Sequence, residues 1–171
     1  VMLDMGIYPI SLVHMFFKKM PQSLHSTYHL LNSGVDGHSC YFFDYGNGKT
    51  ALLSSSIEFT LNEEATIFDE KGFIRIPNFH RGSNLYLFHE DDLDFSSNDA
   101  REKALEGIPE DFPFKDPGLQ FEIQEVHDCL NNNKLQSEIM PIDETIQILK
   151  ICDKFRSRWN LTYPDEGVKI K

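Results

Sequence analysis

Tight-turn signals set between β-compatible segments are the feature that most constrains how this chain can fold. Gly46-Asn47-Gly48 separates segments 39–45 and 49–59, and glycine and asparagine accept the positive φ angles that hairpin turns require. A second turn signal, at 70–72, lies between two further segments of the same kind. Because hairpins pair their strands antiparallel, the sequence predicts an open, mainly antiparallel β-sheet. The expected strands are 23–31, 39–45, 49–59, 65–69, 73–76 and 85–88.

Helical periodicity at both ends of the chain indicates an α+β fold. Apolar residues recur on one face of 4–19, where Asp4 suits the N-cap and Lys18-Lys19 suits the C-terminal end. Two more helices are expected, one after Asp116-Pro117 and one after Pro141. We therefore expect a single domain, residues 1–171, in which helices pack on one face of one sheet and leave the other face free for dimerisation.

The second half of the chain combines an acidic stretch with an amphipathic last helix. Residues 90–118 are rich in acidic side chains and proline, which predicts a long surface loop, with a short helix near 99–105. The last helix is expected to bury one stripe of side chains. That stripe consists of Ile142, Ile146, Leu149, Cys152, Phe155 and Trp159.

The chain is strongly acidic, and this restricts its partners. Its 27 acidic and 16 basic residues give a formal net charge of −11. Such a field repels phosphate backbones and anionic lipid headgroups, so the sequence predicts neither a nucleic-acid partner nor a membrane partner.

The cysteines and histidines predict neither disulfides nor a metal site. Cys40, Cys129 and Cys152 are odd in number and widely spaced, which favours reduced thiols and a cytoplasmic protein. No short Cys/His ligand pair is present in the sequence. His25 and His29 share one face of their strand, but a metal ion would need further ligands.

Both faces of segment 39–45 carry large apolar groups. Helices can cover only one of these faces, so the other is solvated or is buried against a partner. We expect a twofold, sheet-to-sheet homodimer, the alternative being a monomer with a half-polar outer face. One face carries Tyr41, Phe43 and Tyr45, and the other carries Cys40, Phe42 and Asp44.

The opening residues 3–9 read Leu-Asp-Met-Gly-Ile-Tyr-Pro. They resemble the Asp-x-Gly-x-(His/Tyr) signature that opens the C-terminal domain of the Gfo/Idh/MocA (glucose–fructose oxidoreductase/inositol dehydrogenase) family. The tyrosine form resembles the dihydrodiol dehydrogenase branch. Segments 125–130 and 140–145, followed by Trp159 and Tyr163-Pro164, are similar to the family's last two helices in order and spacing. The resemblance covers essentially the whole chain.

The resemblance implies a partner domain that this sequence does not contain. Members of the family have an N-terminal Rossmann domain that binds NAD or NADP and supplies a lysine, in a Glu-Lys-Pro motif, for proton transfer. This sequence has no Lys-Pro dipeptide, and its Gly46 and Gly48 lie in a predicted hairpin and not before a helix. We therefore expect a chain that begins inside a longer protein, has no cofactor-binding residues and is inactive alone.

Four side chains are candidates for contact with a substrate. On a helix from Asp4, Asp4 and Tyr8 project from one face, and Gly6 between them permits a close approach. The resemblance implies that Tyr8 takes the acid/base or substrate-hydroxyl position, while Asp4 orients the absent lysine or holds a substrate hydroxyl. The plainer alternative is an N-cap and a packed aromatic ring. His80 and Arg81, in a loop after the second hairpin, could bind a polar substrate or could simply be exposed.

The chain has one leading functional interpretation and two alternatives. The resemblance implies the substrate-side and oligomerisation domain of an NAD(P)-dependent oxidoreductase that acts on a CH–OH group of a sugar, polyol or cyclic diol. One alternative is a non-catalytic ligand-binding or assembly module of the same fold. The other is an unrelated α+β ligand-binding domain.

Overall fold

The computed structural model describes residues 1–92, 96–98, 100, 106–113, 118–163 and 166. The chain forms two compact units, one made of Val1–Leu61 with Gln136–Lys171 and one made of Asn62–Leu135. Both contain antiparallel strands and helices, so the predicted α+β class is confirmed. No helix among the described residues is long and apolar enough to cross a membrane.

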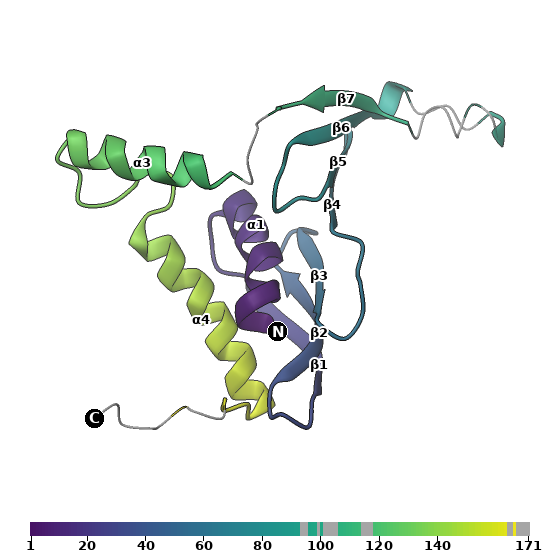
Figure 1. Ribbon diagram of the computed structural model, residues 1–171. Helices are drawn as coiled ribbons and strands as arrows, with labels where there is room; N and C mark the ends of the chain where they lie inside the picture. The colour runs from purple at the N-terminus through teal and green to yellow at the C-terminus, as the bar shows by residue number, and fades with distance from the viewer. Residues whose placement is uncertain (93–95, 99, 101–105, 114–117, 164–165, 167–171) are drawn as a thin grey trace. The chain divides into compact units, whose positions relative to one another are not determined.

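The first unit is built on a three-stranded antiparallel sheet with the order β1-β2-β3. The turn between β2 and β3 is the predicted hairpin, with positive φ at Gly46, Asn47 and Gly48. Helices α1 and α4 both lie on one side of this sheet (Figure 1). The strands are β1 (Ser23–Leu30), β2 (Asp36–Asp44) and β3 (Thr50–Ser56), and the helices are α1 (Ile7–Phe17) and α4 (Ile142–Trp159).

The strand expected over 49–59 ends earlier, at Ser56. The Ser56 hydroxyl accepts hydrogen bonds from the amides of Glu58 and Phe59, at 3.0 and 3.2 Å. This side-chain turn competes with the sheet ladder and directs the backbone away from it. The strands therefore form two sheets, where the sequence predicted one, and β3 does not pair with β4 (Glu64–Asp69).

The opening segment is continuously helical, as predicted. A π-helical turn, η1 (Met2–Gly6), leads directly into α1, which ends at Lys18 in the left-handed conformation. Its buried residues, Met2, Gly6, Ile10 and His14, recur every four positions and face the core.

Helix α4 packs on the sheet from Ile148 onward. Its buried residues are Ile148, Ile151, Cys152, Phe155 and Trp159. The predicted stripe is therefore correct from Cys152 onward and wrong before it. The first part of the stripe, made of Ile142, Ile146 and Leu149, is exposed. The reason is that the aromatic side chains of β2 contact the helix near its end: the rings of Phe43 and Phe155 are centred 5.8 Å apart, and those of Tyr41 and Phe155 5.0 Å apart.

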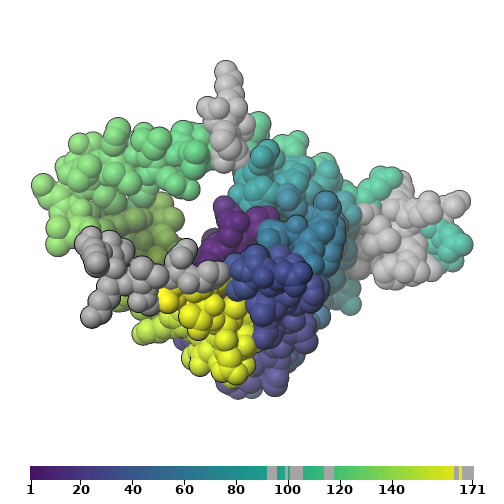
Figure 2. Space-filling model, turned by 60° about the horizontal axis from the view of Figure 1, so that its bottom comes forward, coloured from purple at the N-terminus to yellow at the C-terminus, as the bar shows by residue number. Residues whose placement is uncertain are grey.

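An aromatic pair connects the end of α4 to the first strand. The rings of Tyr28 and Trp159 stack with centroids 4.5 Å apart, and the Tyr28 hydroxyl donates to the Trp159 carbonyl at 2.9 Å. The Trp159 indole N–H donates to the Ser26 hydroxyl, also at 2.9 Å. Figure 2 shows the last turns of α4, in yellow, lying against the blue surface of this part of the sheet.

A fully buried carboxylate, that of Asp36, joins three segments of the first unit. It accepts hydrogen bonds from the main-chain nitrogens of Val1 and Met2, at 2.8 and 2.7 Å. The Tyr163 hydroxyl, beyond the end of α4, donates to it at 3.1 Å, and Ser39 of β2 donates at 3.2 Å. Burial raises the pKa of Asp36, and the hydrogen bonds from the Met2 amide and the Tyr163 hydroxyl act in the opposite direction.

The second unit contains a four-stranded antiparallel sheet with the order β4-β5-β6-β7. Its last strand, β7, lies inside the stretch predicted to be loop, and that part of the prediction is wrong. β7 is an edge strand that pairs with β6, and its Pro109 is tolerated because an edge strand has one unpaired side. The short helix expected near 99–105 falls almost entirely outside the described residues. The remaining elements are β5 (Gly72–Pro77), β6 (Asn84–His89), η2 (Glu90–Asp92), β7 (Ile108–Asp111) and α3 (Leu119–Asn131).

The first prediction concerns Asp36. In Asp36→Asn, an amide N–H₂ replaces one carboxylate oxygen and faces N–H and O–H donors that then lose their acceptor. We expect the free energy of unfolding of the first unit to fall by about 2–4 kcal/mol. Urea unfolding followed by the fluorescence of Trp159 measures this. Asp153→Asn, at a position with a 70% exposed side chain, is the control and is expected to change stability by less than about 0.5 kcal/mol. Equal stabilities for the two variants would contradict the joining role of Asp36.

Candidate functional site

The opening helix presents Asp4 and Tyr8 on its exposed side. They lie four positions apart in the continuous helical segment, and neither belongs to the buried stripe. The Tyr8 side chain is 51% exposed, so the alternative of an aromatic ring packed in the core does not hold. Asp4 makes no side-chain cap, because η1 begins before it, at Met2, whose amide donates to Asp36. Both side chains therefore lie on the solvent-exposed side of the helix.

Gly6 brings this helix into close contact with the sheet. A Cβ atom at Gly6 would lie 2.9 Å from the Tyr41 hydroxyl oxygen and 3.2 Å from Ser55 Oγ. These two hydroxyls are themselves 3.3 Å apart and hydrogen bonded. The glycine in the Asp-x-Gly-x-Tyr pattern thus makes room for the sheet, and the side chains before and after it project outward.

The other tyrosines and the histidine near this helix are poor candidates for acid–base chemistry. Burial raises the pKa of both Tyr41 and Tyr45 to about 12, which keeps these phenols neutral at physiological pH. Burial also lowers the pKa of His14, which favours the neutral imidazole in the core. Asp4 and Tyr8, by contrast, are titratable side chains on the exposed side of this helix.

His80 and Arg81 lie in the second unit, in the turn that follows β5. Asn78, with φ of 46°, reverses the chain, and its carbonyl accepts from the amides of Arg81 and Gly82 at 2.7 and 3.1 Å. His80 Nδ1 lies 3.6 Å from a carboxylate oxygen of Glu63. Both residues are exposed, as a substrate-binding role requires. His80 and Arg81 thus belong to the second unit, whereas Asp4 and Tyr8 belong to the first.

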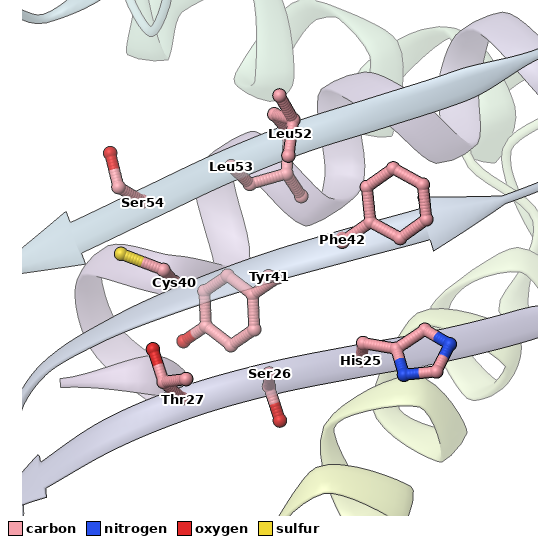
Figure 3. Close-up of a pocket in the computed structure, with 9 residues that line it drawn as sticks. All are labelled: His25, Ser26, Thr27, Cys40, Tyr41, Phe42, Leu52, Leu53 and Ser54. Atoms are coloured by element: carbon pink, nitrogen blue, oxygen red, sulfur yellow. The ribbon is translucent and has the colours of Figure 1, made fainter.

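The outer face of the three-stranded sheet is hollowed and largely apolar. The hollow has a volume of about 450 Å³ and is bounded by side chains from all three strands (Figure 3). The predicted alternation of β2 is confirmed, because Tyr41, Phe43 and Tyr45 are buried under the helices. Leu52 of β3, which the sequence reasoning did not single out, is 81% exposed on the outer face; its alternation with the more buried Ala51 and Leu53 was the available signal. The lining residues are His25, Ser26, Thr27, Cys40, Tyr41, Phe42, Leu52, Leu53 and Ser54.

The described residues do not fit a nicotinamide dinucleotide. A pyrophosphate is bound by backbone amides of a glycine-rich turn that opens a helix. Gly46 and Gly48 instead form a β-hairpin turn, and a Cβ at Gly46 would collide with the side chain of Gln22. No step of a reaction through that cofactor can be derived from these residues.

Comparison with known proteins places these features in a family. The sequence profile described as the GFO/IDH/MocA C-terminal domain matches residues 1–75, which include the opening helix and the first three strands. The chain is 27% identical over 164 residues to the trans-1,2-dihydrobenzene-1,2-diol dehydrogenase of Xenopus tropicalis, a match that covers 95% of the chain and 48% of the relative. It is 26% identical over 163 residues to the scyllo-inositol 2-dehydrogenase (NADP(+)) of Bacillus subtilis (strain 168), covering 95% of the chain and 45% of that protein. The chain thus spans about half the length of these relatives.

Solved structures show the same fold. A UDP-N-acetylglucosamine 3-dehydrogenase from Acidithiobacillus ferrooxidans superposes with a TM-score of 0.71 over 92% of this chain and 46% of that protein, at 14% sequence identity. An oxidoreductase from Agrobacterium radiobacter, in complex with NAD+, L-tartaric acid and magnesium, superposes with a TM-score of 0.58 over 94% of this chain and 47% of its own. At these identities the likeness establishes the fold alone.

The second prediction tests the close approach at Gly6. In Gly6→Ala, the new methyl group forces the Tyr41 hydroxyl or the helix to move, and we expect a loss of about 1–3 kcal/mol in the free energy of unfolding. Tyr41→Phe removes the obstructing oxygen, so the double variant should lose less stability than the two single variants added together. Urea unfolding of all four proteins measures this coupling. Strict additivity would show that Gly6 and Tyr41 do not limit each other.

Proposed function

The chain belongs to the Gfo/Idh/MocA C-terminal domain family, and we propose that it is the substrate-side and oligomerisation domain of an NAD(P)-dependent oxidoreductase. The observation that carries this proposal is the match of 95% of the chain to both a dihydrodiol dehydrogenase and an inositol dehydrogenase. Because those matches extend through both compact units, we propose that the units together form one C-terminal domain, residues 1–171.

The proposed substrate is a sugar, polyol or cyclic diol, and the reaction would take place at one of its CH–OH groups. The names of the two relatives specify a cyclic diol and an inositol, and the relatives align with this chain over nearly its whole length. His80 and Arg81, exposed on their turn, would contact the hydroxyl groups of such a molecule. An acidic protein surface of this kind suits an uncharged polyol better than a phosphorylated one.

The proposed partner in cis is an N-terminal Rossmann domain. That domain would bind NAD or NADP, which supplies the hydride acceptor, and this chain would bind no cofactor alone. Helix α3 is further support for a partner domain, because none of its residues is buried and a partner could cover it. Its exposed apolar side chains are Leu119, Phe121, Ile123, Val126 and Leu130.

The proposed catalytic residues are Tyr8 and Asp4. Oxidation of a carbinol needs a base for the hydroxyl proton, and the Tyr8 hydroxyl would hold or move that proton. A neutral phenol is a poor base, so a neighbouring cation from the Rossmann domain would have to stabilise the phenolate form. Asp4, near it on the same exposed side of the helix, would orient that cation or a substrate hydroxyl. The anchoring of η1 by Asp36 supports this assignment, because catalytic groups need a fixed position.

The proposed assembly is a homodimer formed through the outer face of the three-stranded sheet. Its support is the apolar hollow across all three strands, which Phe42 and Leu52 line from the outer face. An apolar sheet face of this kind is stable in water when a second copy covers it. A cytoplasmic location is part of the same proposal, and it is supported by Cys40, Cys129 and Cys152, none of which forms a disulfide.

The third prediction tests the catalytic role of Tyr8. In the longer protein that contains this domain, Tyr8→Phe removes only the hydroxyl, and we expect kcat to fall by about 10²-fold or more with little change in KM. Tyr86→Phe, on β6 in the second unit, keeps its ring and is the control. An unchanged kcat for Tyr8→Phe would favour the non-catalytic module of the same fold.

In a parallel titration, NAD(P)H should bind the longer protein and not the 171-residue chain.

The fourth prediction tests the homodimer. Leu52→Glu places a charge in the middle of the proposed interface, and we expect the dissociation constant of the dimer to rise by at least about tenfold. Sedimentation of the full chain over a range of concentrations measures it. Leu135→Glu, at a fully exposed position in the second unit, is the control. A wild-type chain that sediments as a monomer at all concentrations would rule out this face as a self-association surface.

A further inference from the structure

Two imidazoles and one carboxylate meet at the edge of the outer sheet face. His29 Nδ1 lies 2.9 Å from a carboxylate oxygen of Glu58, and His38 Nδ1 lies 2.6 Å from the same oxygen. The two rings stack with their centroids 5.3 Å apart. One ligand atom from each of these side chains can be chosen so that all three lie within 4.8 Å of one another. None of the three belongs to the proposed catalytic pair or to the lining of the hollow.

The fold assembles this cluster from three separate segments. His29 of β1 and His38 of β2 are direct cross-strand partners in the antiparallel register, which places their side chains on the same face. Glu58 follows β3 and is turned toward them by the Ser56 hydroxyl, which accepts the Glu58 amide at 3.0 Å. From the sequence, only His25 and His29 were considered together. In the fold, His29 instead lies next to His38 of the neighbouring strand and Glu58 after β3.

Gly37 makes room for the carboxylate. A Cβ atom at Gly37 would lie 2.4 Å from Glu58 Oε2 and 2.7 Å from Leu31 Cδ2, closer than any real contact. The Gly37 carbonyl also accepts the amide of Ile57 at 2.9 Å, which holds the start of the Glu58 turn against β2. The Glu58 carboxylate is thus seated over a backbone that a larger residue would block.

Imidazole nitrogens with a carboxylate oxygen are the ligands of first-row transition metals, whereas Mg²⁺ and Ca²⁺ take mainly oxygen ligands. Ligands held about 2.0–2.2 Å from a tetrahedral Zn²⁺ are about 3.4 Å from one another. The two nitrogen-to-oxygen distances, 2.9 and 2.6 Å, need to open by less than about 1 Å to admit such an ion.

We propose that His29, His38 and Glu58 form a binding site for a divalent transition-metal ion with Zn²⁺-like chemistry, completed by water. The ion would link β1, β2 and the segment that follows β3. It would therefore stabilise the outer sheet face without taking part in the proposed hydride chemistry.

The fifth prediction is a titration of the metal-free, untagged full chain with Zn²⁺ by calorimetry, with Mg²⁺ as a second probe. We expect one Zn²⁺ per chain, no measurable binding of Mg²⁺, and a higher melting temperature with Zn²⁺. Separate His29→Gln, His38→Gln and Glu58→Gln variants should each bind Zn²⁺ at least about tenfold more weakly, and Gly37→Ala should also weaken binding because it displaces the carboxylate. Circular dichroism verifies that each variant is folded.

His25→Gln is the matched control, since His25 lies on the same strand and the same face but outside the cluster. It should bind Zn²⁺ as the wild type does. The proposal is wrong if the wild-type chain does not bind Zn²⁺, or if the three ligand variants bind it as tightly as His25→Gln does. It is also wrong if His25→Gln alone abolishes binding, because the ion would then be held elsewhere on the face.

Discussion

The buried Asp36 carboxylate is the interaction on which the rest of the first unit depends. It accepts hydrogen bonds from the first main-chain nitrogens of the opening segment, from a hydroxyl of its own strand and from the Tyr163 hydroxyl beyond α4. A charge with no exposure persists in a protein core only when hydrogen bonds replace its water. Those bonds also satisfy helix-terminal N–H groups that would otherwise have no acceptor. One carboxylate therefore fixes the start of the helix that carries Asp4 and Tyr8.

The two faces of the three-stranded sheet have different tasks for a simple geometric reason. Alternate side chains of β2 point to opposite sides, so Tyr41 and Phe43 can build a core with α1 and α4 while Cys40 and Phe42 remain outside. The inner face positions the proposed catalytic helix through the close approach at Gly6. The outer face carries the apolar hollow at its centre and the His29–His38–Glu58 cluster at its edge.

Much of the fold followed from local sequence signals, and the exceptions have identifiable causes. The hairpin at Gly46-Asn47-Gly48, the opening helix and the last helix were predictable because turn chemistry and periodicity act over a few residues. The end of β3 was missed because the Ser56 side chain captures two amides, a local competition that strand propensity does not register. The exposure of Ile142, Ile146 and Leu149 in α4 was missed because an apolar stripe does not reveal how far its packing partner extends.

The sequence by itself determined the alternation of β2, the spacing of Asp4, Gly6 and Tyr8, and the family resemblance that these residues carry. Only the tertiary structure decided that side chains of the sheet occupy the space beside Gly6, that Tyr8 is exposed and that Asp36 anchors the helix. It alone brought His38 and Glu58 to His29. Periodicity and turn signals depend on neighbours along the chain. Cross-strand register and buried hydrogen bonds join residues from distant segments, and no local pattern encodes which of them will meet.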